Sequence, residues 1–256
     1  MTDDRIESVD SGRIEGRNAV TEALKRGRPI DKLFVSEEGD SSLRHLASIA
    51  AERGIPVVRV SRKKLDSMSL SHAHQGVIAV AAAAEYASID DIFTLAQQSG
   101  RPPLIVVCDG ISDTGNLGAI VRSAECAGAH GVIIPKRHSA GLTAAAAKAA
   151  SGALEYIPIV RVPNISAALR GLKERGIWVF GAAAEGASSL YDADLRGPSA
   201  IVVGSEGEGI SRVVRENCDF IVSIPMLGHL SSLNASVAAG VFLFEAVRQR
   251  ISGSLK

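Results

Sequence analysis

The chain has 256 residues, 46% of them hydrophobic, which is enough to bury the core of a small and a medium-sized domain. Lysine plus arginine and aspartate plus glutamate both number 28, so a global positive field is excluded and any RNA binding must depend on local patches. Three cysteines without a C-x-x-C pair exclude a disulfide framework. Residues 1–12 lack the apolar core of a secretory signal, and the longest apolar run, 235–244, is too short to span a bilayer, so we expect a soluble cytoplasmic protein.

The first third of the chain predicts a small α/β unit. Its apolar patterns predict helices at 18–25 and 43–53, strands at 32–36, 57–60 and 77–83, and a short helix before the last strand. Residues 88–100 predict a polar amphipathic helix, and the Arg101-Pro102-Pro103 segment that follows is typical of a domain boundary. We therefore expect an N-terminal domain at 13–85, a linker at 86–102 and a C-terminal domain at 103–256.

The rest of the chain predicts a second α/β series. It opens with five apolar residues, 104–108, which suit a strand covered on both faces. Further strands are expected at 132–134, 157–160, 178–180, 200–203 and 220–224, and helices at 117–127, 144–154, 165–175, 211–217 and 234–248. Three of these strands run into loops rich in glycine and small polar residues. Because open α/β sheets bind ligands at the carboxyl ends of their strands, these loops are the candidate site.

The first loop, 109–122, ends in a helix that carries Arg122 away from its apolar stripe. Gly118 lies one turn earlier, and helical side chains lean toward the N-terminus. The Arg122 guanidinium is therefore expected to lie back over Gly118 toward Asn116. The alternative is a surface arginine paired with Glu125 or another carboxylate, which is the commoner fate of a helical arginine.

The second and third loops follow strands 200–203 and 220–224. Three glycines in 204–209 allow close approach to a ligand, but the loop lacks both the G-x-G-x-x-G fingerprint and the lysine of a P-loop. Glu206 needs hydrogen-bond partners or a polar ligand, unless the loop is a tight turn with a solvated glutamate. In the third loop, Ser231 or Ser232 is expected to cap the next helix, and Asn234, on its first turn, to face the same crevice; the alternative is an ordinary capped helix.

Taken in order, the segments N-L-G-A-I-V-R (116–122), G-S-E-G-E-G (204–209) and I-P-M…S-L-N-A-S-V-A (224–238) resemble the motifs of the SpoU family of RNA 2′-O-ribose methyltransferases, within the SPOUT superfamily. Segments 14–20 and 74–77 resemble the substrate-binding domain that many members carry, so the resemblance covers nearly the whole chain. Relatives usually have a proline after the aspartate of the first motif, whereas Asp113 is followed by Thr114-Gly115. Within the family the chain looks closest to enzymes that methylate a guanosine ribose in 23S ribosomal RNA.

The resemblance implies a fold, a cofactor and roles for particular residues. The fold would be a small N-terminal α/β substrate-binding domain, similar to ribosomal protein L30e, followed by a SPOUT α/β domain with a C-terminal trefoil knot. The enzyme would be a homodimer that uses S-adenosyl-L-methionine, with an active site built from both subunits. The implied catalytic residues are Arg122, Asn116, Glu206, Ser232 and Asn234. The implied cofactor-binding residues are Gly204, Gly209, Ile224, Met226 and Leu233.

Two of these roles have alternatives. Arg122 is assigned to the reacting ribose and its adjoining phosphate; because a free guanidinium has a pKa above about 12, a phosphate clamp is a safer role than a base. Glu206 would either position Arg122 or accept the hydroxyl proton.

RNA contacts are predicted in the first domain at Arg17 and, within a basic cluster, at Lys63 and Lys64. No metal is expected, because His72 and His74 lack a third ligand and are better explained as structural histidines. The alternative functions are a tRNA 2′-O-methyltransferase and a non-catalytic RNA-binding or ribosome-assembly protein. A nucleotide-dependent oxidoreductase is disfavoured by the missing G-x-G-x-x-G fingerprint.

Overall fold

The computed structural model describes residues 12–71, 73–186 and 188–254. The chain divides into two compact units: the first ends at Ala84 and takes in Leu142–Ala144, and the second holds Glu85–Gly141 and the residues from Ala145 onward. Both units combine helices with a sheet, which confirms the predicted α/β class. Within the described residues, no helix has the length and apolar character needed to cross a bilayer.

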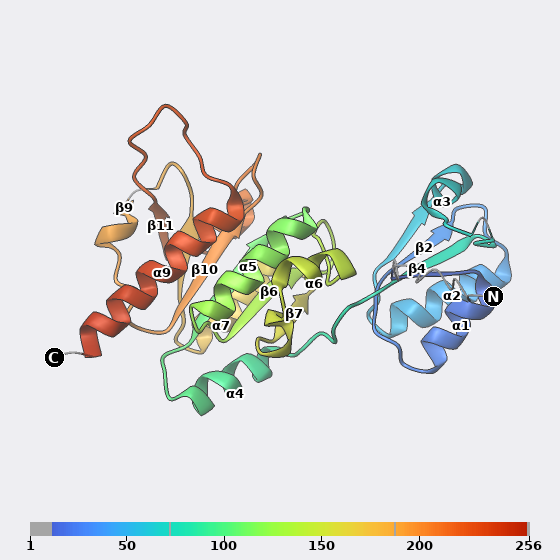
Figure 1. Cartoon of the computed structure of the whole chain (residues 1–256), viewed down its shortest axis with the longest axis horizontal. Helices are drawn as coiled ribbons and strands as arrows, with labels where there is room; N and C mark the ends of the chain where they lie inside the picture. Colours follow the sequence, from blue (N-terminus) through green and yellow to red (C-terminus); the bar gives the residue numbers. More distant parts are fainter. Residues whose placement is uncertain (1–11, 72, 187, 255–256) are drawn as a thin grey trace, which may run out of the picture. The chain divides into compact units, whose positions relative to one another are not determined.

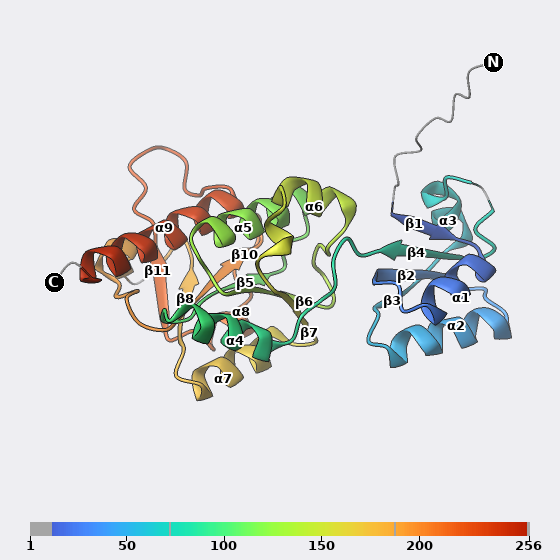
Figure 2. The ribbon, with the colours of Figure 1, turned by 60° about the horizontal axis from the view of Figure 1, so that its bottom comes forward.

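The first unit is a four-stranded sheet with the order β1-β4-β2-β3. Its strands are β1 (Arg13–Glu15), β2 (Ile30–Ser36), β3 (Val57–Val60) and β4 (Val77–Ala81), and its helices are α1 (Arg17–Lys25), α2 (Ser41–Glu52) and α3 (Arg62–Met68). The apolar sides of α1 and α2 form one core with the sheet, whereas α3 lies on its other face (Figure 2). The short strand β1, which pairs antiparallel with β4, was not predicted, because three residues give no periodic signal.

The second unit is a parallel sheet with the order β7-β6-β5-β10-β8-β11-β9 (Figure 1). The strands are β5 (Leu104–Asp109), β6 (Gly131–Pro135), β7 (Ile159–Val162), β8 (Trp178–Ala182), β9 (Ser188–Ser189), β10 (Ser199–Gly204) and β11 (Phe220–Ser223). The helices are α4 (Ile89–Ser99), α5 (Thr114–Cys126), α6 (Ala144–Ala150), α7 (Ile165–Glu174), α8 (Arg212–Arg215) and α9 (Ala235–Ser254). The order reverses between β5 and β10, and such a switch point is where open α/β sheets place a ligand site.

Helices cover both faces of this sheet. Apolar side chains of α4, α7 and α8 share a core with β5 and β10, and α5 and α9 lie together on the opposite face (Figure 2). The side chains of β5 from Leu104 to Cys108 are all buried, as expected of a strand covered on both faces. The trefoil knot stays a prediction.

Several predicted elements differ in their bounds from those observed; the helix expected at 234–248, for example, runs on to Ser254. The helix expected at 144–154 ends at Ala150, and a separate 3₁₀ turn follows at Ala153–Glu155. The break occurs because Ser151 and Gly152 both have positive φ, of 50° and 87°, which no right-handed helix accommodates. The neighbouring strand, predicted at 157–160, lies two residues later, at 159–162.

A buried histidine joins the amino end of β5 to α4. His130 accepts a hydrogen bond on Nδ1 from the backbone N–H of Leu104 (3.0 Å), and its Nε2 lies 2.9 Å from Ser99 Oγ. Burial, together with the charges of Arg101 and Arg250, lowers the pKa of His130 to about 4. The imidazole is therefore neutral at pH 7 and acts as a structural crosslink of the sheet.

Candidate active site

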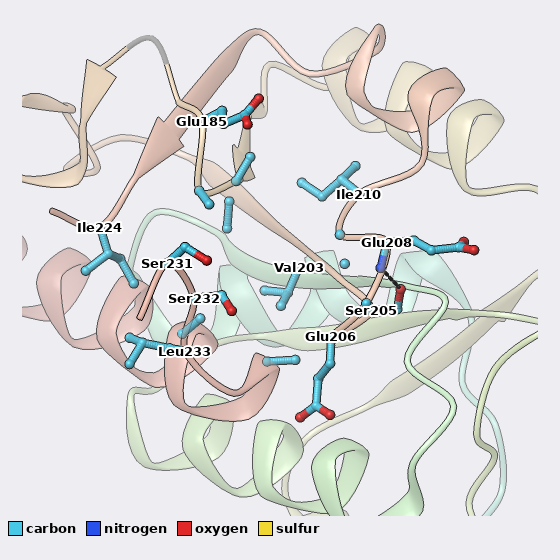
Figure 3. Close-up of a pocket in the computed structure, with 18 of the residues that line it drawn as sticks. Glu185, Val203, Ser205, Glu206, Glu208, Ile210, Ile224, Ser231, Ser232 and Leu233 are labelled. Carbon is cyan, nitrogen blue, oxygen red and sulfur yellow. Dashed lines mark hydrogen bonds between the residues drawn. The ribbon is translucent and has the colours of Figure 1, made fainter. Parts of the chain in front are cut away.

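A pocket opens at the carboxyl ends of β8 and β10, with a volume of about 420 Å³. In Figure 3, Ile224, Ser232 and Leu233 of the third loop lie across the pocket from Val203 and Ile210. Backbone and small side chains make up much of the rest of the lining, so the pocket offers main-chain donors and acceptors beside apolar surface. Such a lining suits a ligand that combines a flat apolar group with polar atoms.

The glycine loop after β10 is closed on itself. The backbone groups of Ser205 and Gly209 exchange two hydrogen bonds, of 3.1 and 2.9 Å. A β-carbon on Gly204 would overlap the carbonyl group of Gly209 and the backbone nitrogen of Ile210. Because the two chain segments meet in this way, only glycine fits at position 204.

Three polar side chains from the three loops meet beside the pocket. Glu206 Oε1 accepts hydrogen bonds from Asn116 Nδ2 (2.9 Å) and from Asn234 Nδ2, and Asn234 Nδ2 also donates to Asn116 Oδ1 (2.9 Å). Figure 3 shows the Glu206 carboxylate at the rim, directed away from Val203 and Ile210. Residues separated by up to 118 positions thus form one cluster, but Arg122, which was expected in the same crevice, makes no hydrogen bond with it within the described residues.

Asn234, and neither Ser231 nor Ser232, caps helix α9. Its Oδ1 accepts from the backbone N–H groups of Ser236 (2.9 Å) and Val237 (3.3 Å), the usual pattern of an N-cap. The prediction of a serine cap and of Asn234 on the first turn was wrong, because the helix begins at Ala235. Asn234 therefore uses its carbonyl oxygen for the helix and its amide group for the cluster, while Ser232 lines the pocket.

Arg122 does not take the expected path over Gly118. A β-carbon at Gly118 would overlap Ala149 and would lie 2.9 Å from the Ala150 nitrogen, so helix α6 fills that space. The exposed guanidinium instead donates from Nη1 to Ser151 Oγ over 3.5 Å. The alternative of a carboxylate partner fails as well, because the part of the chain that the structure describes gives Arg122 no ion pair with Glu125 or any other acid.

The five predicted cofactor-binding residues fall together. They all line the pocket: Gly204, Gly209, Ile224, Met226 and Leu233. Of the residues expected to be catalytic, Glu206 and Ser232 also line the pocket. Asn116 and Asn234 do not line it, but both donate a hydrogen bond to Glu206. Arg122 is outside the lining and lies six residues beyond Asn116, about 9 Å along α5 at 1.5 Å per residue.

Several contributing residues were not predicted. Residues 182–185 after β8 line the pocket, as does Arg215, which donates to the Glu185 carbonyl over 3.2 Å. Asp109, at the end of β5, accepts a hydrogen bond on Oδ2 from the backbone N–H of Ser211 (2.8 Å) and so fixes the far end of the glycine loop. Residues 183–185 follow a strand end, so the rule that selected Glu206 also applied to them, but without a glycine-rich loop they gave no stronger signal. Asp109 opens the first predicted loop, but no role was assigned to it.

The predicted RNA contacts of the first unit differ from one another. Lys63 and Lys64 are exposed near the start of α3. Arg17 is less available, because its Nη1 pairs with Asp40 (2.7 Å) and its Nε donates to the Gln75 carbonyl (3.1 Å). Arg17 therefore shapes a hollow of about 490 Å³ instead of extending into solvent.

His74 is buried and has a partner at each ring nitrogen. Its Nδ1 accepts from the backbone N–H of Gly76 (3.0 Å), so the proton lies on Nε2, which contacts Asp66 Oδ1 (2.8 Å). This bonding agrees with the structural interpretation of His74, and His72 lies outside the described residues. No cluster of three metal-ligating side chains occurs among residues 12–71, 73–186 and 188–254.

Comparison with known proteins gives matches over both units. The model of the SpoU rRNA Methylase family matches residues 103–244, and that of RNA 2′-O ribose methyltransferase substrate binding matches residues 13–87. The protein YacO of Bacillus subtilis strain 168, assigned to the TrmH family of tRNA/rRNA methyltransferases, is 44% identical over 92% of this chain and 94% of its own length. A tRNA/rRNA methyltransferase of Mycobacterium avium strain 104 that is described as uncharacterized is 48% identical over 92% of this chain and 76% of its own length.

Solved structures agree with these matches. The SpoU methyltransferase AviRb from Streptomyces viridochromogenes, in complex with the cofactor AdoMet, is 29% identical with a TM-score of 0.61, covering 98% of this chain and 96% of that one. The AdoMet-bound rRNA methyltransferase from Sinorhizobium meliloti is 27% identical with a TM-score of 0.57, covering 92% and 86%. The two family models agree with the relatives and with the solved structures. The chain therefore belongs to the SpoU family of methyltransferases.

Proposed function

We propose that this chain transfers a methyl group from S-adenosyl-L-methionine to the 2′-hydroxyl of a guanosine in 23S ribosomal RNA. The observation that carries the proposal is the hydrogen-bonded cluster of Asn116, Glu206 and Asn234 at the rim of a pocket lined by every predicted cofactor-binding residue. A ligand site and a set of polar groups for a second, polar reactant thus lie side by side. This arrangement suits a two-substrate transfer.

The pocket fits the cofactor by its chemistry. Main-chain groups around Gly204 and Gly209 would hold the polar edge of the adenine, while Ile224, Met226 and Leu233 would cover its faces. When bound there, S-adenosyl-L-methionine supplies a methyl group made electrophilic by the adjoining sulfonium. The closed glycine loop would keep the pocket in one shape before the cofactor arrives, which reduces the ordering cost of binding.

The reaction needs the ribose oxygen in line with the methyl carbon and its proton removed. Of the two roles predicted for Glu206, proton acceptance is the better supported, because the described residues show no contact between Glu206 and Arg122. Its Oε1 is held by the amide groups of Asn116 and Asn234, which fixes the carboxylate relative to the pocket. Arg122 would bind the adjoining phosphate and stabilise developing negative charge.

The proposal includes a homodimer with a shared site. Three exposed apolar side chains on α9 recur every seven residues: Val237, Phe244 and Ile251, each at least half exposed. Their spacing places them on one side of the helix, where a second copy would cover them. The position of Arg122 outside the pocket of its own chain fits a site completed by two subunits. The mass of the full chain in solution measures this directly, and a monomer at micromolar concentration would contradict it.

Mapping ribose methylation in RNA from cells with and without this protein tests the substrate. We expect one guanosine of 23S ribosomal RNA to lose its 2′-O-methyl group, and the purified chain with S-adenosyl-L-methionine to restore it. Loss of the modification from tRNA alone would support the tRNA alternative. Cofactor binding without any change in RNA methylation would support a non-catalytic RNA-binding or ribosome-assembly role.

Arg122→Ala should separate cofactor binding from turnover. We expect the dissociation constant for S-adenosyl-L-methionine, measured by calorimetry, to stay within about threefold, because Arg122 does not line the pocket. Methylation should fall by about 100-fold or more if the arginine stabilises charge in the transition state. Arg137→Ala, at an exposed position of the same unit, is the control. Undiminished methylation by Arg122→Ala would remove the residue from the mechanism.

A further inference from the structure

The turn after α6 contacts Arg122 from outside the three motif loops. Close packing of α6 over Gly118 fixes this helix against α5. Ser151 directly follows α6, and Arg122 lies one turn beyond Gly118, so the same packing brings Ser151 Oγ within 3.5 Å of Arg122 Nη1. The position of the Arg122 guanidinium thus depends on α6 as well as on its own helix.

The backbone at Ser151 is in an unusual conformation. Its φ of 50° lies in the left-handed region, which is less favourable for a residue with a β-carbon than for glycine. Glycine would make the same turn without strain, and Gly152, with a φ of 87°, already does so next to it. A strained serine whose hydroxyl contacts a candidate catalytic arginine points to a role for the hydroxyl itself.

The contact also preserves the charge of Arg122. Some exposed arginines of this unit are paired with carboxylates, for example Arg196 with Asp194 at 2.7 Å. The part of the chain that the structure describes gives Arg122 only the neutral Ser151 hydroxyl, at a long distance. A hydroxyl orients a guanidinium without neutralising it, so the full positive charge is left for an incoming anion.

We propose that Ser151 is a positioning residue, which holds the Arg122 guanidinium ready to receive a phosphate of the RNA substrate. The inference rests on the proposed function, because the phosphate is that of the methylated strand. It adds a residue to which neither the motifs nor the pocket assigns a role. Its chemistry predicts that the hydroxyl affects turnover through Arg122 and leaves the cofactor pocket unchanged.

Two substitutions of Ser151 separate the hydroxyl from the turn. Ser151→Gly removes the hydroxyl and relieves the backbone strain, so we expect an unchanged or higher melting temperature together with a fall in kcat of about tenfold or more. Ser151→Asn keeps a residue that tolerates the left-handed region and supplies a side-chain oxygen for Arg122, so we expect kcat within about threefold of wild type. If Ser151 served only the turn, Ser151→Gly would keep full turnover, and that result would overturn the proposal.

A double-mutant cycle with Arg122→Ala gives the second test. Because Ser151 acts through Arg122, Ser151→Gly should add no further loss of kcat in the Arg122→Ala background. If the fold losses of kcat caused by Ser151→Gly and by Arg122→Ala multiply in the double variant, the two residues act independently, and that result would also overturn the proposal. The salt dependence of RNA binding is a readout apart from turnover: Ser151→Gly and Arg122→Ala should reduce its slope by a similar amount. Absence of methylation by wild-type protein would instead reject the proposed function, so the two failures are distinguishable.

Discussion

Gly204→Ala is expected to abolish cofactor binding and to destabilise the second unit. The added β-carbon would overlap the Gly209 carbonyl group and the Ile210 nitrogen, which are backbone atoms that no rotamer change can move. To make room, the loop would have to give up the paired hydrogen bonds between Ser205 and Gly209. Overpacking of this kind costs about 1–3 kcal/mol of unfolding free energy. Calorimetry with S-adenosyl-L-methionine and urea unfolding measure the two effects.

Gly207→Ala is the matched control for stability, because it adds the same methyl group to the same loop. A β-carbon at Gly207 has no atom within 4 Å outside its chain neighbours, and its φ is not in the left-handed region. We expect its unfolding free energy to stay within about 0.5 kcal/mol of wild type. If Gly204→Ala unfolds like Gly207→Ala and binds the cofactor normally, the closed loop is not what shapes the pocket.

The convergence of the site could be predicted because it follows from a rule about parallel sheets. Strands β5 and β10 are parallel neighbours, with Gly204 paired to Asp109, so the loops that follow them must emerge side by side. Buried apolar runs marked both strands in the sequence. The meeting of Asn116 with Glu206, 90 residues later, is therefore a consequence of strand order.

The start of the last helix was predicted wrongly because the local sequence pattern does not distinguish between neighbouring N-cap candidates. Ser231, Ser232 and Asn234 are all good N-cap residues, and periodicity fixes the start of a helix only to within a few residues. The helix begins at Ala235, so Asn234 is the cap. The cap is also what orients its amide group toward Glu206, which connects this boundary to the chemistry of the site.

The path of Arg122 could not be predicted, because it is set by a contact between two helices. From the sequence alone, Gly118 is an open position over which a long side chain can lie. In the fold, α6 approaches α5 at Gly118, where a β-carbon would overlap Ala149. The alanine-rich run before Ser151 predicted a continuous helix by propensity, but the helix ends before Ser151, whose φ is positive and whose hydroxyl contacts Arg122.

Glu206→Gln is expected to remove most of the turnover while leaving the site assembled. A glutamine can present its side-chain oxygen to the amide groups of Asn116 and Asn234 just as Glu206 Oε1 does, so the cluster need not rearrange. It cannot accept a proton from the ribose hydroxyl. Loss of a general base typically lowers kcat by about 10²–10⁴-fold. We expect that fall in methylation, with the dissociation constant for S-adenosyl-L-methionine within about threefold of wild type.

The split between kcat and KM distinguishes a base from a group that only positions the substrate. If Glu206 accepts the proton, Glu206→Gln lowers kcat and leaves the KM for RNA near the wild-type value, because binding of the ground state does not need the proton to move. Glu174→Gln, on the exposed surface of α7, is the matched control and should keep both constants. A kcat within about threefold of wild type together with a raised KM for RNA would assign proton removal to another group and leave Glu206 as the anchor that joins Asn116 to Asn234.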